Sequence, residues 1–167
     1  MPTESRIDKK IMFSIVIVCY NCENMVDYTL NSLINQEYNN YEIIVIDGKS
    51  QDSTLVKIQD KLKNIKVDCK IISEKDNGIY DAMNKGIKLC NGDYIFFLNI
   101  GDRFVDNKVL SNIANKINGK DIYYGDYIKN KEIISQPDKL TNLYFWLEKM
   151  ICHQTIFSKT ELLQRNN

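Results

Sequence analysis

Short apolar runs, each ending on a polar residue, most constrain how this chain can fold. The most complete run is residues 94–98, Tyr-Ile-Phe-Phe-Leu, which stops at Asn99 and Gly101 and leaves Asp102 beyond it. Such a run is typical of a strand buried on both faces in a parallel sheet. Ligands of open α/β sheets bind outside the carboxyl ends of the strands, where an acid can hold a metal ion. Taken alone, the stretch favours an ordinary strand-to-loop exit, which uses the same residue types.

Predicted strands and helices alternate along most of the chain. Apolar and β-branched runs predict strands at 13–19, 42–47, 69–74, 94–98 and 122–124. Apolar residues at helical spacing predict helices at about 24–36, 55–62, 79–90 and 107–117. Parallel neighbours need a crossover helix, so this order predicts an α/β fold with a doubly wound, mainly parallel sheet flanked by helices. We expect residues 1–10 to form a flexible tail and residues 11–167 one domain.

Four predicted strands end in polar residues, at Asn21, Asp47, Asp102 and Asp126. Parallel strands bring their carboxyl ends to one edge, and converging carboxylates are costly unless a cation neutralises them. This pattern indicates a divalent metal and an anionic, phosphorylated ligand. Neither Gly-x-Gly-x-x-Gly nor Gly-Lys-Ser/Thr follows any strand, which argues against a dinucleotide dehydrogenase and a P-loop enzyme. A metal that bridges a diphosphate would perform the same electrostatic task.

Charge and hydropathy exclude several other classes of protein. Lys plus Arg equals Asp plus Glu at 22 each, so nothing favours a nucleic acid or an anionic membrane surface as partner. No apolar run approaches the roughly 20 residues that span a bilayer, and the N-terminus is too polar for a signal peptide. We therefore expect a cytoplasmic protein.

The cysteines number five, an odd count that fits reduced thiols better than a disulfide framework. Cys19 and Cys22 match the Cys-x-x-Cys spacing of thioredoxin-like redox sites and follow a strand. A structural zinc site would need a second close pair of ligands, and the only histidine is His153. We interpret most of the cysteines as small buried apolar residues and rank the redox interpretation below that.

Four further segments together carry a resemblance to a known family. They are residues 13–21 (FSIVIVCYN), 45–54 (VIDGKSQDST), 76–86 (DNGIYDAMNKG) and 98–102 (LNIGD). In this order they resemble family 2 glycosyltransferases of the GT-A fold, and the likeness runs from about Phe13 to Gln154. Each motif alone is unspecific, but four in register are specific. The 76–86 segment and the Ile-Cys-His-Gln of residues 151–154 are most similar to the bacterial branch that builds surface polysaccharides such as O-antigen.

The resemblance implies a nucleotide-sugar donor, commonly a uridine diphosphate (UDP) sugar, at the carboxyl edge of the sheet. Asp47 would accept a hydrogen bond from the base. Asp81 and Asn84 would face the donor from their helix, although a solvated helix face accounts for Asn84 equally well. The other residues implied in donor binding are Cys19, Tyr20, Asn21, Ser50, Asn99 and Gly101.

Asp102 resembles the last acid of the family's Asp-x-Asp metal motif, whose preceding acid is replaced here. One carboxylate can hold Mg²⁺ or Mn²⁺ when diphosphate oxygens and waters complete the shell, so we expect poor metal affinity without nucleotide. His153 is a further candidate for a donor-facing or metal-facing role. For Asp126, a turn and a site role are equally consistent with the sequence.

The mechanism implied by the resemblance is inverting transfer, in which a base deprotonates the acceptor hydroxyl as it attacks the anomeric carbon. The family's base is an Asp or Glu downstream of the position of His153. The chain ends at Asn167, and Glu148 and Glu161 match no motif. We therefore expect the usual base and part of the acceptor region to be missing, which leaves His153 and Asp126 as the remaining candidates.

Two alternatives to an active transferase stay open. One is a truncated or inactive nucleotide-sugar-binding module. The other is a metal-dependent nucleotidyltransferase, although the basic, glycine-rich loop usual in such enzymes does not follow the first strand. The expected partners are the donor and a glycan or lipid-linked acceptor. A lipid-linked acceptor would bring the chain to the inner face of the membrane, but no basic amphipathic helix shows an anchor. The sugar and the oligomeric state, a homodimer included, are open.

Overall fold

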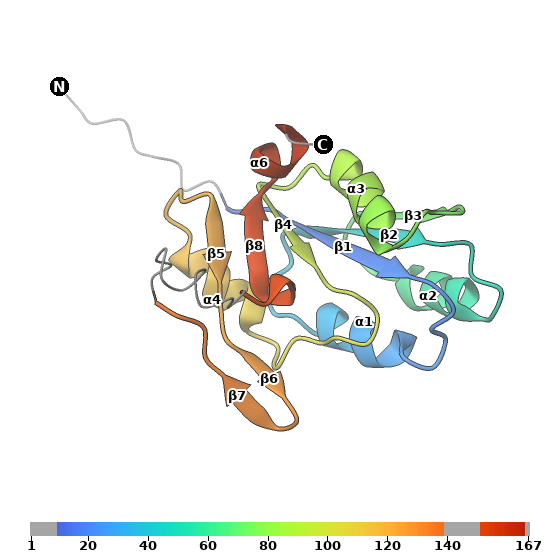
Figure 1. The fold of residues 1–167 in the computed structure, drawn as a ribbon, viewed down its shortest axis with the longest axis horizontal. Coiled ribbons are helices and arrows are strands. Elements are labelled where there is room, and N and C mark those ends of the chain that lie inside the picture. The colour runs from blue at the N-terminus through green and yellow to red at the C-terminus, as the bar shows by residue number, and fades with distance from the viewer. Residues whose placement is uncertain (1–9, 139–150, 166–167) are drawn as a thin grey trace.

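The computed structural model describes residues 10–138 and 151–165 (Figure 1). Within them, one sheet has the strand order β3-β2-β1-β4-β8-β5, and β6 pairs with β7 in a hairpin. The strands are β1 Phe13–Cys19, β2 Tyr41–Asp47, β3 Cys69–Ser73, β4 Tyr94–Phe97, β5 Ile122–Tyr124, β6 Tyr127–Lys129, β7 Glu132–Ile134 and β8 Ile156–Lys159. The helices are α1 Val26–Ile34, α2 Thr54–Leu62, α3 Ile79–Leu89, α4 Val109–Lys116, α6 Thr160–Arg165 and the 3₁₀ helix η1 His153–Thr155.

The predicted doubly wound, mainly parallel sheet is confirmed. Strands β1 to β4 are parallel neighbours, and every residue of β1 and β2 is buried, as their continuous apolar runs require. None of the helices in residues 10–138 and 151–165 combines the length and the apolar character needed to cross a membrane. Most of the predicted tail, and Glu148, lie outside the described residues.

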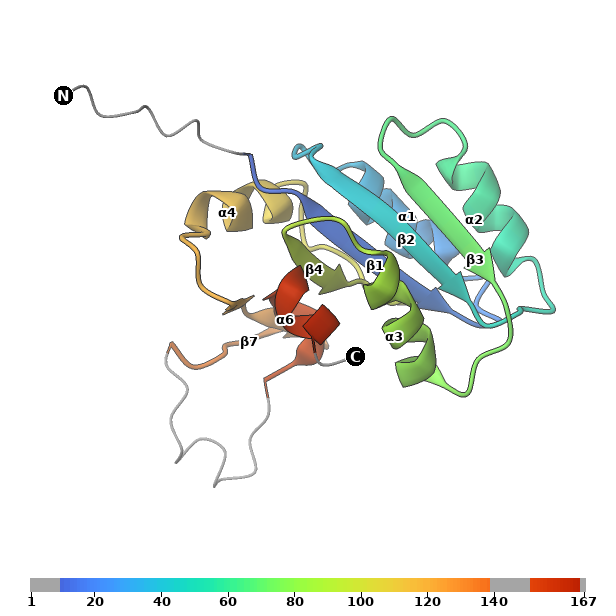
Figure 2. The ribbon, with the colours of Figure 1, turned by 90° about the horizontal axis from the view of Figure 1, so that it is seen from above.

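Helices cover both faces of the sheet (Figures 1 and 2). Phe13, Ile15 and Ile17 of β1 share one apolar core with α1, α2 and α4. The alternate residues Val16 and Val18 join the core under α3 on the other face. Helix α3 lies very close to β1 at Gly86. A Cβ at this position would be 2.5 Å from Val16 Cγ1, so the close approach depends on the missing side chain.

Strand β8 is a feature that the sequence did not predict. It runs antiparallel between β4 and β5, so the predicted strand at 122–124 is an edge strand paired with β8 and not with β4. Phe157 fixes it there, because its ring stacks on Phe96 with centroids 4.4 Å apart and contacts Phe13 edge-on at 5.4 Å. Since β5 is antiparallel to β8, it points the same way as β4, and its carboxyl end lies at the predicted edge.

A buried carboxylate joins the amino ends of the parallel strands. Glu42 of β2 is 2% exposed and accepts hydrogen bonds from Ser14 Oγ (2.7 Å), Asn91 N (2.6 Å) and Asn91 Nδ2 (3.1 Å). Lys70 Nζ of β3 lies 3.2 Å from Glu42 Oε2, and Gly92 N, just before β4, donates to Ser14 Oγ. Burial raises the pKa of Glu42, but these donors outweigh it and hold the pKa below its usual value.

We predict that Glu42→Gln lowers the free energy of unfolding at pH 7 by about 2–3 kcal/mol, because an amide cannot accept all of these hydrogen bonds. The lowered pKa means that the charged form stabilises the fold above the unfolded-state pKa, and that this stability is lost as the pH falls through the lower folded value. The difference between wild type and variant should therefore shrink on acidification below about pH 4.5. Urea unfolding across pH measures both effects.

Glu132→Gln, at an exposed position of the hairpin, is the matched control and should unfold like wild type. Equal midpoints for wild type and Glu42→Gln at pH 7 would contradict a stabilising role for the carboxylate.

Candidate functional site

The loops that follow β1 and β2 are tied together at the carboxyl edge of the sheet. Asn21 N donates to Ser50 Oγ (2.9 Å), and Gln51 N donates to Asn21 Oδ1 (2.8 Å). Asn21 and Lys49 have left-handed backbone, with φ of 46° and 63°, a conformation that Asn tolerates better than most residues. Two residues implied in donor binding, Asn21 and Ser50, therefore lie side by side in a cross-linked pair of loops.

Asp47, at the end of β2, is completely buried and surrounded by protein donors. Its carboxylate accepts hydrogen bonds from Ser50 N (3.1 Å), from Ser50 Oγ and from Ser73 Oγ (2.6 Å). Cys19, which the resemblance places in the nucleotide pocket, is 8% exposed and belongs to the apolar core. Asp47 thus organises its own loop, and its contact with a base stays a prediction.

Tyr20 and Asp76 lie over the buried backbone of Gly48 at the surface of these loops. Tyr20 is 61% exposed. A Cβ at Gly48 would lie 2.6 Å from Asp76 Oδ2 and 3.4 Å from Tyr20 Cδ2, so the glycine lets both side chains close over the backbone. Asp76 Oδ1 accepts a hydrogen bond from Gly78 N (2.9 Å). Asp76 was not predicted as a site residue, although it opens the 76–86 motif just after β3.

The end of β4 meets the segment that contains His153. Gln154 Nε2 donates a hydrogen bond to Asp102 Oδ2, whereas His153 itself is exposed. Gly101 has a φ of 110° and donates its N–H to Thr29 Oγ1 of α1 (2.9 Å). The 151–154 segment therefore reaches Asp102 through Gln154, and the donor-facing or metal-facing role of His153 stays a prediction. This contact could not be predicted from the sequence, because Gln154 carries a neutral amide.

Asn99 carries a buried oxygen without a hydrogen-bond partner among the described residues, its side-chain Oδ1. Asn99 follows β4 in the chain and lies three residues before Asp102. Amide and carboxylate oxygens are ligands that Mg²⁺ and Mn²⁺ accept, so this donor set fits such an ion. In the part of the chain that the structure describes, no group of three or more His, Cys, Asp or Glu could hold a metal. An ion here would need further ligands from a bound molecule or water.

Two other predicted acids have local partners. Asp81, in the first turn of α3, accepts a hydrogen bond from Asn77 N (3.0 Å) and lies 3.4 Å from Lys85 Nζ. The Asn77 hydrogen bond, helped by Lys85, holds the pKa of Asp81 below its usual value. Asp126 is exposed and accepts a hydrogen bond from Gln136 N (2.8 Å), which closes the base of the β6–β7 hairpin. The donor-facing role of Asn84, which is exposed on α3, stays a prediction.

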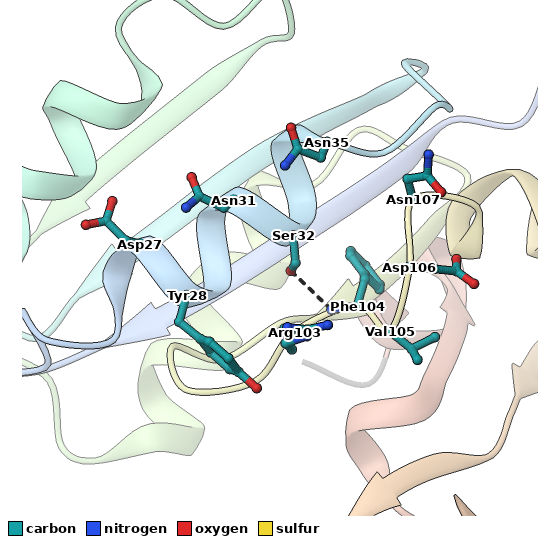
Figure 3. Close-up of a pocket in the computed structure, with 10 residues that line it drawn as sticks. All are labelled: Asp27, Tyr28, Asn31, Ser32, Asn35, Arg103, Phe104, Val105, Asp106 and Asn107. Atoms are coloured by element: carbon teal, nitrogen blue, oxygen red, sulfur yellow. Dashed lines mark hydrogen bonds between the residues drawn. The ribbon is translucent and has the colours of Figure 1, made fainter. Parts of the chain in front are cut away.

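Two cavities formed by the described residues lie away from the predicted site residues. One, of about 350 Å³, lies between α1 and residues 103–107 (Figure 3). There the Arg103 guanidinium is 5.5 Å from the centroid of the Tyr28 ring, and Phe104 N donates to Ser32 Oγ. Another, of about 670 Å³, surrounds Asn91 at the amino edge of the sheet. No predicted site residue lines either of these two cavities.

Two solved structures with this fold were determined in complex with nucleotide sugars. Residues 1–349 of Staphylococcus aureus TarS in complex with UDP-GlcNAc match with a TM-score of 0.78 and 23% identity, over 93% of this chain and 47% of that one. The mannosyltransferase PcManGT of Pyrobaculum calidifontis, solved with GDP-Man and Mn²⁺, matches with a TM-score of 0.73 and 16% identity, over 93% and 46%. The fold is therefore that of the GT-A glycosyltransferases.

The sequence defines the family. The family model for glycosyl transferase family 2 matches residues 14–163, so the chain belongs to this family, as its motifs predicted. A PGL/p-HBAD biosynthesis glycosyltransferase of Mycobacterium tuberculosis is 30% identical over 154 residues, which cover 90% of this chain and 60% of the relative. The Escherichia coli enzyme WfaP, a UDP-Glc:alpha-D-GlcNAc-diphosphoundecaprenol beta-1,3-glucosyltransferase, is 34% identical over 127 residues, 74% of this chain and 49% of WfaP. The matched part is thus about half to three fifths of each relative.

We predict that Asp47→Asn lowers the free energy of unfolding by about 1–3 kcal/mol, because an amide NH₂ would face donors that the carboxylate now satisfies. Urea unfolding measures the loss. Asp60→Asn, at a side chain that is 70% exposed, is the matched control and should leave stability unchanged. A fully stable Asp47→Asn variant would show that the buried hydrogen bonds do not hold the loop.

Proposed function

We propose that this chain binds the donor in an inverting glycosyltransferase, which transfers a sugar from a nucleotide diphosphate sugar to a glycan or lipid-linked acceptor during polysaccharide synthesis. The observation that carries the proposal is the placement of Asn99 and Asp102 at the same sheet edge as the joined loops of Asn21 and Ser50. Membership of glycosyl transferase family 2 supports the reaction class. The name of WfaP supports a UDP sugar and a diphosphoundecaprenol-linked acceptor, at the cytoplasmic face of the membrane in our proposal.

The exposed ring of Tyr20 is the surface that we assign to the nucleotide base. The ring lies against Gly48, whose missing side chain lets Tyr20 and Asp76 pack over the buried loop backbone and leaves the outer face of the ring exposed. Stacking on an aromatic ring accepts any base, so specificity would come from polar groups around it. Asp76 Oδ2 is the atom nearest to the position that a Cβ at Gly48 would take. Asp47 lies behind this surface and would act by holding the Ser50 loop in place.

The metal site that we propose consists of Asp102 and Asn99 Oδ1, with Mn²⁺ or Mg²⁺ as the ion. Gln154 would fix the orientation of the Asp102 carboxylate through its hydrogen bond. When bound, the ion would stabilise negative charge on the departing diphosphate. His153, next to Gln154 in the chain and exposed, is free to approach a bound donor. Because the mannosyltransferase PcManGT was solved in complex with GDP-Man and Mn²⁺, Mn²⁺ is the first ion to test.

We assign neither Asp126 nor His153 as the base that deprotonates the acceptor hydroxyl. Asp126 and His153 are both exposed, and Asp126 already accepts hydrogen bonds from Gln136 N and Ser135 Oγ. In the described residues, no hydrogen bond joins either side chain to another predicted site residue. Donor binding is therefore the activity that we assign to the described residues.

We predict that Tyr20→Ala weakens UDP binding, measured by calorimetric titration, because it removes the stacking surface. Stacking of one base contributes about 1–3 kcal/mol, so the affinity should fall at least roughly fivefold. Tyr28→Ala is the matched control, since Tyr28 is also exposed but lies on α1 beside the cavity of Figure 3. Equal UDP affinities for Tyr20→Ala and Tyr28→Ala would remove Tyr20 from the donor site.

A second prediction concerns the metal. UDP should bind more tightly with Mn²⁺ than with chelator, and Asp102→Asn should abolish most of this difference because the remaining ligand set is neutral. Mn²⁺ alone should bind poorly. Asp106→Asn, an exposed acid four residues further along the chain, is the control that should keep the metal effect. If UDP affinity is the same with metal and with chelator, the proposed metal site is wrong.

A further inference from the structure

The cavity between α1 and residues 103–107 has a polar lining that the proposed donor site does not use (Figure 3). On α1 the lining residues recur at helical spacing and are Asp27, Tyr28, Asn31, Ser32 and Asn35. Val26, Leu30 and Leu33 of the same helix are buried in the core. The amphipathic helix therefore turns a polar side, rich in amide and hydroxyl groups, toward the cavity.

Hydrogen bonds along the cavity join its two walls. Ser32 Oγ of α1 accepts a hydrogen bond from Phe104 N (3.1 Å). Just after α1, Glu37 N donates to Asn107 O (2.9 Å). The cavity of about 350 Å³ is thus held open between fixed walls, and its volume lies in the range of small-ligand sites. A ligand that enters it does not have to order the walls first.

Three polar side chains of the lining are unpaired. Among the described residues, no hydrogen bond or ion pair reaches the side chains of Asn31, Asn35 or Arg103. The Arg103 guanidinium lies 5.5 Å from the centroid of the Tyr28 ring, which is 46% exposed. Each asparagine offers an acceptor oxygen and an NH₂ donor, and the guanidinium offers only donors. The cavity therefore presents unpaired donors and acceptors next to an aromatic ring.

The charges of the lining favour a neutral ligand. Arg103 is positive, whereas Asp27 and Asp106 are negative, and Lys61 Nζ lies 2.7 Å from Asp27 Oδ1. An anion would approach two carboxylates along with the guanidinium, and a cation would approach the guanidinium. A sugar avoids both costs, because its hydroxyls donate and accept hydrogen bonds, while its C–H face can pack on a ring such as that of Tyr28.

From this geometry we propose that the cavity between α1 and residues 103–107 is a binding site for neutral saccharides, separate from the donor edge. Asn31, Asn35 and Arg103 bond the sugar hydroxyls, and Tyr28 packs on the sugar ring. The inference goes beyond the proposed function and does not depend on it, since it concerns residues that the donor site does not use.

The test titrates the isotope-labelled whole chain with glucose, N-acetylglucosamine and their β-1,3-linked disaccharide, followed by amide NMR. Concentrations up to about 50 mM reveal millimolar affinity. With at least one of these sugars, we expect saturating shifts of the side-chain NH₂ signals of Asn31 and Asn35 and of the backbone signals of residues 103–107. Glucuronate, which adds a carboxylate to the ring of glucose, should bind more weakly than glucose.

Two variants test the residues that we assign. Asn31→Ala should weaken sugar binding about fivefold by removing hydrogen bonds, and Tyr28→Ala should weaken it by a similar factor by removing the ring. Alanine is a good helix former, so α1 should stay intact in both variants. Asn64→Ala, at an exposed amide just after α2, is the matched control and should bind sugar like wild type.

Four outcomes would overturn the inference. They are signals of residues 28–35 and 103–107 that no sugar moves, glucuronate that binds more tightly than glucose, sugar that UDP with Mg²⁺ displaces, and Asn31→Ala with wild-type sugar affinity. Failure of the proposed function is a separate result. A chain that binds sugar at the cavity but no UDP would overturn the donor site and support this one, whereas a chain that binds UDP alone would do the reverse.

Discussion

The buried carboxylate of Glu42 is the interaction on which the rest of the sheet depends. Through Ser14, Lys70 and Asn91 it contacts β1, β3 and the approach to β4, and its own strand is β2. An isolated buried charge would be strongly unfavourable, so the fold is stable only when these partners are together. This requirement fixes the relative register of four parallel strands at their amino ends. It therefore also aligns their carboxyl ends, where the candidate site lies.

Polar groups at the carboxyl edge fall into two kinds. Asp47 and Asn21 have protein partners, and their hydrogen bonds make a rigid pair of loops. The ring of Tyr20 is exposed, and Asn99 Oδ1 is a buried oxygen without a hydrogen-bond partner among the described residues. These two groups are therefore the ones that we assign to a ligand. A site built this way loses little entropy when a nucleotide diphosphate binds, because the supporting loops are already ordered.

The sequence predicted the elements whose signal is local and missed those held by distant contacts. Continuous apolar runs identified β1, β2 and β4. Strand β8 was missed because it has only two apolar residues and depends on the stacking of Phe157 on Phe96. An acid at a strand end is normally solvated, so the complete burial of Asp47 could not be foreseen. Gln154 gave no signal because a neutral amide fits any surface.

The most direct test of the account is to map, by backbone amide NMR, where UDP with Mg²⁺ binds on the labelled chain. We predict that the largest chemical-shift changes fall on residues 20–21, 48–50 and 99–102, with smaller changes elsewhere. Changes centred on Asn91 at the amino edge, or on the cavity beside Tyr28, would contradict a donor site at the carboxyl edge of the sheet.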